Sequence, residues 1–425
     1  MLKSGQSKQK QLAFVLMLYL VLFLFLKYLL QLSPGIFIAD LLEITHGKAK
    51  AVGLLAAVYL YAYLILQIPA GIIVDRYKLS NVILSAVIIC LTGTILFACT
   101  KNFYLLIISR ILMGIGSAFG TVCYMRAAAL YFSDKGFARL SGFFGTACMG
   151  GAGATVLIFG YIYTRFGIDG TSLAIILFTG FLSILGLIFC FLEPHMQQKN
   201  NLNCSNKVPA IQTIKNILLN KSNILLLLYN GLAFAPISVF GGLWGKSFLQ
   251  NIHNLSLDQS TTAISVMFFS FAIGGPVLTS LFVGQKKQRN IMAAGIFVSL
   301  VFFISFVYLP HGALNYGTIL GLMAVIGFFT SSFVASYAIA KSYNEINVIA
   351  TVIAIVNMGD PIFAGLAEPI MGVFMDAAGG NLGIRTYQIG FMVLVLYWIS
   401  AVICALCLPM QKESTVQDKA TSFAR

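Results

Sequence analysis

The chain has 425 residues, of which 59% are hydrophobic and only 9% are charged, and its mean hydropathy is +0.91. About a quarter of the residues of a soluble protein are charged, so this chain has too little charge to cover a globule in water. Lipid is therefore the solvent for much of its surface, which excludes soluble enzymes and DNA-binding proteins. The net charge of +14 then indicates loops facing an anionic membrane surface, and we expect no nucleic acid partner.

Apolar segments long enough to cross a bilayer recur along the whole chain. We expect twelve spans, at residues 11–39, 51–73, 80–99, 103–132, 137–163, 171–192, 221–250, 260–283, 291–309, 315–341, 348–377 and 386–409. None of these runs has the period-two alternation of a β-barrel strand. The prediction is an all-α membrane protein with twelve transmembrane helices in two pseudo-symmetric six-helix bundles. Two repeated bundles are typical of a transporter.

The longest polar stretch, Glu193 to Lys221, separates the sixth span from the seventh. We therefore expect an N-terminal bundle over residues 1–195, a cytoplasmic loop over 196–220, and a C-terminal bundle with a short cytoplasmic tail over 221–425. With the N-terminus inside, 17 basic residues lie on the inner side and six, including Lys246, on the outer side. This bias predicts that both termini are cytoplasmic, in a multi-pass protein of a bacterial inner membrane.

The sequence has no convincing catalytic or metal-binding motif. The pair Cys404 and Cys407 has C-x-x-C spacing but lies in an apolar segment without a second ligand pair, so buried small residues are the better interpretation. H-E-x-x-H, G-x-S-x-G and nucleotide-binding loop motifs are absent from the sequence. We expect no enzyme activity, no metal, no cofactor and no ATP-driven pumping.

The loop after the second span contains Gly71, Asp75 and Arg76 in the run PAGIIVDRYK. Gly71 would let its helix approach a neighbour closely, and Asp75 could pair with a basic residue or accept from a helix N-terminus. The run resembles the signature loop of the major facilitator superfamily, G-x-x-x-D-R/K-x-G-R/K-R/K, although Lys78 stands where the family often has glycine. The resemblance implies a cytoplasmic clasp that gates transport; the alternative is an ordinary charged loop.

A second motif begins at Arg110, in the run RILMGIGSAFG. Gly116 and Gly120 have the G-x-x-x-G spacing of closely packed helices. The run resembles the helix 4 motif R-x-x-x-G-x-G of the same superfamily, which implies a cavity-facing or proton-coupling role for Arg110. The fifth span lacks the Gly-Pro step of drug–proton antiporters, which disfavours a drug exporter.

Four longer runs carry a narrower resemblance: LLQLSPGIFIADLL, YLYAYLILQIPAGIIVDRY, RILMGIGSAFGTVCYMRAAALYF and NMGDPIFAGLAEPIMGVFMD. They resemble the phagosomal nutrient transporter-type branch of the superfamily. Its members import nutrients such as amino acids and nucleosides into intracellular bacteria. Siderophore transporters occur among related sequences, so the resemblance leaves the substrate open.

Ionisable and polar side chains at membrane depth are costly and mark candidate sites. Our candidates for substrate binding are Lys27, Gln31, Tyr59, Tyr63, Arg126, Asn230, Tyr337 and Asn357. Alternatives remain open for several of them: Lys27 and Gln31 could bond a neighbouring helix, Arg126 could extend to the lipid headgroups, and tyrosines populate interfacial belts. Pro236, shortly after Asn230, predicts a helix break that lines a cavity.

The eleventh span holds the two acids at membrane depth, Asp360 and Glu368. A buried carboxyl group can bind and release a proton, or it can lock the two halves through an ion pair. We assign proton coupling or gating to Asp75, Arg76, Arg110, Asp360 and Glu368. Four basic residues against two acids within or beside the spans favour an anionic or zwitterionic substrate.

The leading hypothesis is a secondary active transporter that imports a small polar nutrient, such as an amino acid or another carboxylate-containing metabolite, as a proton symporter. The expected partners are this solute, a proton or cation gradient and the lipid bilayer, with the protein as a monomer. A siderophore transporter or metabolite exporter on the same fold is the main alternative. A transporter-like receptor, which would bind substrate without flux, is a further one.

Overall fold

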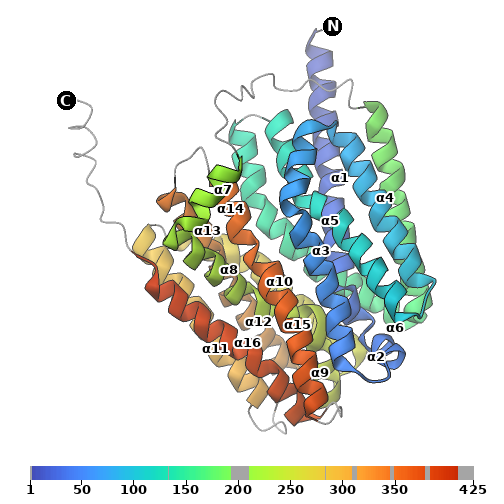
Figure 1. Cartoon of the computed structure of the whole chain (residues 1–425), viewed down its shortest axis with the longest axis vertical. Helices are drawn as coiled ribbons and strands as arrows, with labels where there is room; N and C mark the ends of the chain where they lie inside the picture. The colour runs from blue at the N-terminus through green and yellow to red at the C-terminus, as the bar shows by residue number, and fades with distance from the viewer. Residues whose placement is uncertain are drawn as a thin grey trace, which may run out of the picture.

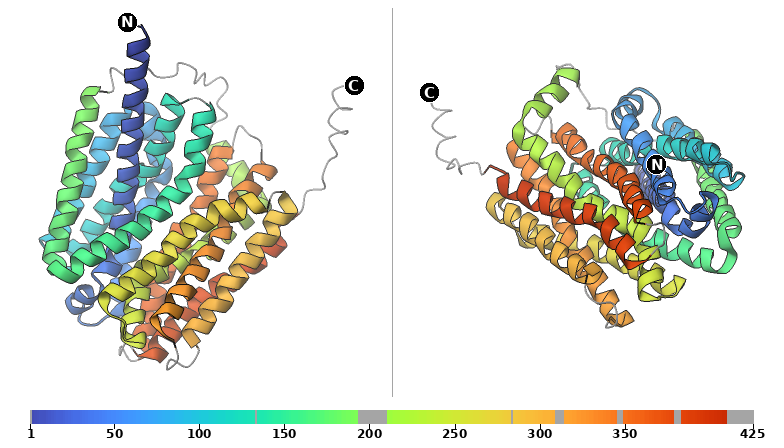
Figure 2. Two further views of the ribbon diagram at one scale, coloured as in Figure 1. Left: turned by 180° about the vertical axis from the view of Figure 1, so that it is seen from behind. Right: turned by 60° about the horizontal axis from the view of Figure 1, so that its bottom comes forward.

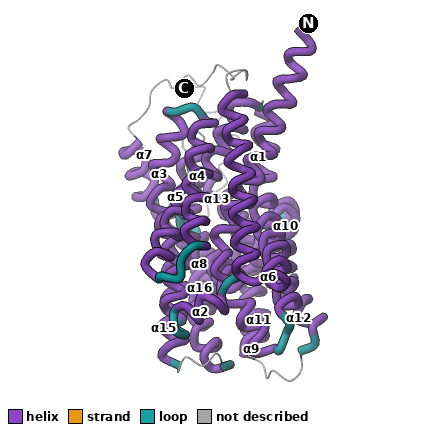
Figure 3. Tube along the Cα trace, turned by 90° about the vertical axis from the view of Figure 1, so that its right-hand side faces the viewer, coloured by secondary structure: helices purple, strands orange, loops and turns teal. Residues whose placement is uncertain are grey.

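The computed structural model describes residues 2–132, 134–192, 210–282, 284–308, 314–344, 349–378 and 383–409. In this part of the chain the regular structure is helical throughout, as Figure 3 shows. The expected all-α fold is therefore confirmed. The expected loop at 196–220 is described only from residue 210 onward, and the C-terminal tail after residue 409 lies outside the described residues.

The N-terminal half comprises α1 (Leu2–Ile36), α2 (Ile38–Ile44), α3 (Ala49–Arg76), α4 (Leu79–Ala98), α5 (Phe103–Tyr131) and α6 (Asp134–Leu192). The apolar part of α6, Phe143–Leu192, has 50 residues. At about 1.5 Å per residue its length is more than twice the thickness of the hydrocarbon core of a bilayer. The helix is broken at Gly167, whose φ of 64° is a conformation that favours glycine. It therefore supplies two spans.

The C-terminal half comprises α7 (Ala210–Leu219), α8 (Lys221–Val239), η2 (Phe240–Trp244), α9 (Gly245–His253), α10 (Leu257–Leu281), α11 (Gln285–Tyr308), α12 (Tyr316–Thr330), η3 (Ser331–Val334), α13 (Ala335–Tyr343), α14 (Ile349–Asn357), α15 (Gly359–Ala377) and α16 (Ile384–Cys407). The break expected near Pro236 is the π-helical turn η2, which follows the proline by four residues. Eleven helices among the described residues can cross a membrane. With α6 counted twice, they give the twelve expected spans.

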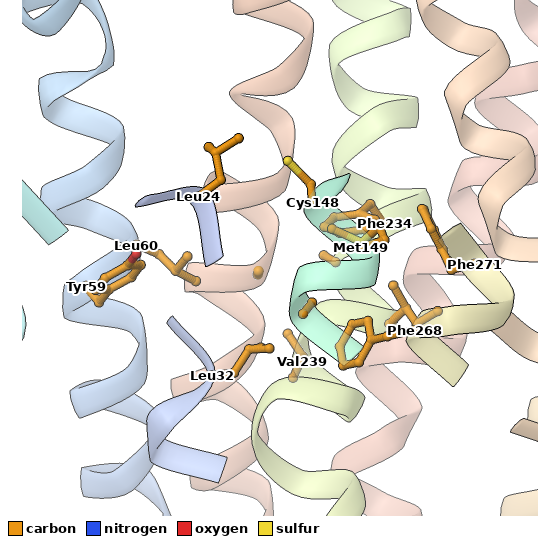
Figure 4. Packing of buried hydrophobic residues seen from close by; sticks show 14 of the residues in the cluster. Leu24, Leu32, Tyr59, Leu60, Cys148, Met149, Phe234, Val239, Phe268 and Phe271 are labelled. Atoms are coloured by element: carbon orange, nitrogen blue, oxygen red, sulfur yellow. The ribbon is translucent and has the colours of Figure 1, made fainter. Parts of the chain in front are cut away.

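The two halves pack against each other mainly through three pairs of elements: α3 with α15, α6 with α10, and α1 with η2. Figures 1 and 2 show the blue-to-green half beside the yellow-to-red half, with the N-terminus at one end and α2 and α9 at the other. Buried apolar side chains fill both halves. Figure 4 shows Leu24 and Leu60 of the first half, and Phe234 and Phe271 of the second, whose rings lie 5.6 Å apart.

Glycines allow the closest approach between helices, but not all at the expected positions. A Cβ at Gly114 would collide with the carbonyl of Tyr59, and one at Gly116 with Cys90. At Gly120 it would make only ordinary contact, and at Gly71 it would meet nothing within 4 Å. The expected close contact at Gly71 is therefore wrong for this conformation. In the α5 motif the tight pair is Gly114 and Gly116, because α3 and α4 approach it from two sides.

Candidate functional site

Lys27 of α1 carries a buried ammonium group on the face of the N-terminal half that is turned toward the C-terminal half. The residue is 7% exposed. Its Nζ lies 3.9 Å from the ring centroid of Tyr28 and 5.0 Å from that of Tyr63, which is cation–π geometry. It makes no hydrogen bond or ion pair to another described residue. The three N–H donors of this ammonium are therefore available to a ligand.

Asp360, in the first turn of α15, places a carboxylate opposite Lys27 from the other half. It is half-buried, its Oδ1 is buried without a hydrogen-bond partner, and the two side chains are close enough to interact electrostatically. A cation from one half and an anion from the other thus lie within electrostatic range of each other. This arrangement can hold both ends of a zwitterion.

Three further polar candidates lie on the C-terminal half around Asp360. The hydroxyl of Tyr337 donates to Oδ1 of Asn357 at 2.9 Å and lies in electrostatic range of Asp360 and Tyr63. Asn230 donates to Ser336 Oγ at 3.4 Å, while its own Oδ1 is buried without a partner. An orphaned buried acceptor is costly, so Asn230 adds a second unsatisfied oxygen to this side of the site.

Arg110 of α5 is fully buried, and its donors are used differently from those of Lys27. They bond Leu55 O at 3.1 Å, Leu30 O at 2.5 Å, Ser33 Oγ at 3.1 Å and Gln31 O at 3.4 Å. The guanidinium lies 4.8 Å from the ring centroid of Tyr59. Arg110 therefore ties α5 to α1 and α3 through backbone oxygens. A planar guanidinium with five N–H donors can reach several oxygens on different helices at once.

Tyr59 supports Lys27 and Tyr63 and is itself fully buried. Its hydroxyl donates to the backbone carbonyl of Lys27 at 2.9 Å. Its ring stacks on Tyr63 with the centroids 6.5 Å apart. Gln31 is half-buried. The structure thus places Tyr59 between Arg110 and the tyrosine that contacts Lys27.

Glu368 lies two turns of α15 beyond Asp360, on the side of Arg110. It is 7% exposed, and its Oε2 is buried without a hydrogen-bond partner. Its charge interacts with those of Arg110 and Asp360, but the Arg110 donors bond backbone and hydroxyl oxygens instead. A Cβ at Gly53 of α3 would collide with the carbonyl of Glu368. The acid is therefore fixed at a close contact between the halves.

The remaining candidates are Arg126, Asp75 and Arg76. Arg126 is half-buried on α5, 16 residues beyond Arg110, which is about 24 Å along a helix. Arg76 is exposed at the end of α3, and the side chain of Asp75 lies outside the described residues. The substrate role of Arg126 and the clasp at Asp75 and Arg76 stay predictions.

Lys246 is in a different environment from the one expected. We counted it among the basic residues of the outer side, and the structure shows that its side chain is buried, with 5% exposed. Its Nζ donates to the carbonyl of Ile36, at the end of α1 in the other half, at 2.9 Å. Its place inside the apolar run 221–250 was the available signal. Sequence reasoning also missed Tyr28, whose ring contacts the neighbouring Lys27, and Asp376, whose partners on α3 lie more than 300 residues away in sequence.

The fold and this arrangement agree with the comparison to known families. A model of the Major Facilitator Superfamily matches residues 15–340, about three quarters of the chain. The chain belongs to this superfamily. The narrower phagosomal nutrient transporter-type branch stays a prediction, since the match is to the superfamily as a whole.

Solved structures of the superfamily have the same fold. One is a bacterial homologue of the human lysosomal transporter Spinster in an inward-facing, unoccupied conformation. It has a TM-score of 0.68 and 16% identity over 94% of this chain and 95% of that chain. An inward-facing, occupied structure of such a homologue gives a TM-score of 0.65, with 16% identity over 92% and 95% of the two chains. At this identity the likeness concerns the fold alone.

One curated relative is an uncharacterised transporter, YybO, of Bacillus subtilis (strain 168). It is 32% identical over 96 residues, which cover 22% of this chain and 22% of the relative. The match therefore spans about a fifth of the relative's length. By family and fold, the chain belongs to a superfamily of membrane transporters.

Proposed function

We propose that the protein is a secondary active transporter for a small solute that carries a carboxylate, bound between Lys27 of one half and Asp360 of the other. The observation that supports this most strongly is the ammonium group of Lys27. It is buried, lies over two tyrosine rings and has no hydrogen bond to another described residue. A buried charge without such a partner costs free energy, and an anionic ligand would offset this cost by accepting hydrogen bonds from the ammonium.

The opposing carboxylate of Asp360 narrows the substrate class to zwitterions such as amino acids. A substrate carboxylate would accept from Lys27 while its ammonium donates to Oδ1 of Asp360, the oxygen without a partner. Tyr337 and Asn357, already joined by a hydrogen bond, would hold a polar side chain. Because the two charges come from different halves, this substrate would also bridge them.

The packing of the halves supports alternating access. The hydrogen bonds from Ala49, Lys50 and Tyr61 to α15, and from Lys246 to α1, join the halves at mid-depth or toward the end away from the N-terminus. With a cytoplasmic N-terminus, the protein would be closed to the outside. The inward-facing conformation of the similar Spinster homologue agrees with this assignment. Rocking of the halves would then expose the same site to the other side.

Glu368 is our candidate for the proton-carrying group. It is buried, has an orphaned oxygen and faces an arginine whose donors are already engaged. Protonation would remove a charge from the contact between α15 and α3 and so change the energy of their separation. Asp360 is more exposed and would serve the substrate. This division of roles supports coupling to protons, whereas uptake rather than export rests on the resemblance stated for the sequence.

The remaining assignments rest on the sequence patterns. A bacterial inner membrane, cytoplasmic termini and membership of the phagosomal nutrient transporter-type branch agree with the basic residues in the loops and the four resembling runs. A monomeric state is part of the same proposal. Uptake measured in right-side-out and inside-out vesicles separates import from export. A siderophore substrate would raise the melting temperature in the binding screen described next.

The experiment is a thermal-shift screen of the purified protein against amino acids, other carboxylates, nucleosides and siderophores. A ligand that binds the folded state raises the melting temperature by mass action. We expect zwitterionic amino acids to stabilise the wild type and to lose this effect in Lys27→Ala. Lys101→Ala, at an exposed lysine, is the matched control. Binding of nucleosides or siderophores with no carboxylate hit would contradict the proposal.

A further inference from the structure

Two helix ends of the N-terminal half meet the C-terminal half at the closed end of the molecule. They are the C-terminus of α1 at Ile36 and the N-terminus of α3 at Ala49. The four last carbonyls and four first N–H groups of any helix need partners from outside it. Neither end provides a charge of the favourable sign on its own: α1 has no basic residue in its last turn, and α3, which begins beside Lys48 and Lys50, has no acid in its first turn and no side-chain cap.

The C-terminal half supplies both missing caps. Asp376, near the end of α15, accepts from the backbone N–H of Ala49 at 2.8 Å through Oδ1 and from that of Lys50 at 3.0 Å through Oδ2. Lys246 donates to the carbonyl of Ile36 at 2.9 Å. The acid thus meets a helix N-terminus and the base a helix C-terminus, so both charges match the helix dipoles.

Neighbouring groups strengthen the lysine contact. Asp40 of the N-terminal half accepts from the hydroxyl of Tyr163 at 2.6 Å and interacts electrostatically with Lys246. The ammonium also lies 5.1 Å from the ring centroid of Tyr163. The second half therefore inserts a buried lysine between an acid, an aromatic ring and a helix end of the first.

Glycines bring the backbones close enough for these contacts. A Cβ at Gly35 would collide with the carbonyl of Gly242, and one at Gly372 would lie 2.6 Å from the carbonyl of Ala49. Each latch thus has a glycine contact beside it. When the halves separate here, both helix ends and both charged side chains lose their partners together.

We propose that Asp376 and Lys246 are the two latches of the outer gate, and that each works by capping a helix end of the opposite half. This rests on the alternating-access function proposed above. Breaking one latch shifts the protein toward the conformation open to the outside. The gate residues are distinct from the substrate site, so they set the conformational balance and not the choice of solute.

The test measures access to a cysteine beneath the gate, and it needs no substrate. Val156 is buried and lines a small cavity with Lys246 and Gly242. Val156→Cys is made in a background without the native cysteines and treated with a charged, membrane-impermeant thiol reagent in right-side-out and inside-out vesicles. We expect slow labelling from the outside. Asp376→Asn and Lys246→Met should each increase its rate about fivefold, the population change that loss of one helix cap produces.

Matched controls are Asp169→Asn and Arg165→Met, which remove exposed charges from the outer part of α6. They should leave the labelling rate unchanged. Equal rates in the two latch variants, their double variant and the controls would overturn the proposal. Because no ligand enters this measurement, a wrong substrate class would leave its result intact.

A second readout avoids the buried cysteine. Spin labels at Lys101→Cys and Arg385→Cys occupy exposed positions on opposite halves. Electron–electron distance measurements should show a longer-distance population in both latch variants and not in the controls. An unchanged distance distribution in the double variant contradicts the latch assignment.

Discussion

The contacts of Asp376 and Lys246 across the halves, which we call the seam, differ from the central site around Lys27 and Asp360 in how their polar groups are paired. At the seam, the charged side chains of Asp376 and Lys246 are paired across the halves with backbone groups. At the central site, Lys27 has no hydrogen bond to another described residue, and one oxygen of Asp360 is buried without a partner.

This difference separates closure from binding. A buried polar group without a partner costs free energy, and a paired one does not. Paired groups across the seam therefore stabilise one conformation. Unpaired groups in the centre carry a free-energy cost that a bound ligand can remove. A transporter needs both, because a site satisfied by the protein itself would gain little from its substrate.

The largest effect should come from breaking the most completely paired group, Arg110. Arg110→Met leaves carbonyls of α1 and α3 without their donors and removes the positive charge near Glu368. We expect a loss of about 3–5 kcal/mol of stability, measured as a fall in melting temperature. Adding Glu368→Gln should restore part of it. If Arg110→Met is as stable as the wild type, the guanidinium does not hold these helices.

A smaller loss should follow from obstructing the seam. Gly35→Ala places a methyl group against the carbonyl of Gly242, and overpacking of this kind costs about 1–3 kcal/mol. We expect a lower melting temperature and faster labelling of Val156→Cys from outside. Gly145→Ala is the control, since a Cβ there meets nothing within 4 Å. Equal behaviour of the two alanine variants would contradict a tight seam.

Glu368→Gln should separate binding from coupling. The amide cannot release a proton, so we expect substrate binding and exchange to persist while accumulation driven by a pH gradient is lost. For one proton per substrate, a gradient of one pH unit supports about tenfold accumulation. Uptake into vesicles with and without the gradient measures this ratio. A Glu368→Gln protein that still concentrates substrate would exclude Glu368 as the proton carrier.

The smallest effect is expected at the edge of the central site. Tyr337→Phe removes the hydroxyl that donates to Asn357 at 2.9 Å. Loss of one neutral hydrogen bond should weaken substrate binding about fivefold, which corresponds to about 1 kcal/mol. Titration calorimetry with the hit from the screen measures the change. A loss as large as that of Lys27→Ala would mean that Tyr337 contacts a charged group of the substrate.

Composition and periodicity predicted the fold because they depend only on local sequence. Long apolar runs gave the spans, and the break inside α6 falls at Gly167, between the expected fifth and sixth spans. For the central site, the rule that polar residues at membrane depth are functional selected Lys27 and Asp360 from opposite halves. The structure brings these two within electrostatic range.

Partners across the halves could not be predicted in this way. Lys246 resembled a loop lysine, since nothing in its own segment indicates that the end of α1 lies opposite. Asp376 was not a candidate, because the uncapped N-terminus of α3 is more than 300 residues away in sequence. The sequence indicated coupling or gating for Arg110 and substrate binding for Tyr59. In the structure their polar groups donate to backbone carbonyls of neighbouring helices.

The central claim is that Lys27 binds the carboxylate of the substrate. The most direct measurement compares the dissociation constants of the screen's hit and of its carboxamide analogue, for the wild type and for Lys27→Ala. A charge-assisted hydrogen bond contributes about 1.5–3 kcal/mol, so the wild type should prefer the carboxylate by about 10- to 100-fold. The account predicts that this preference disappears in Lys27→Ala. A preference of equal size in both proteins would contradict it.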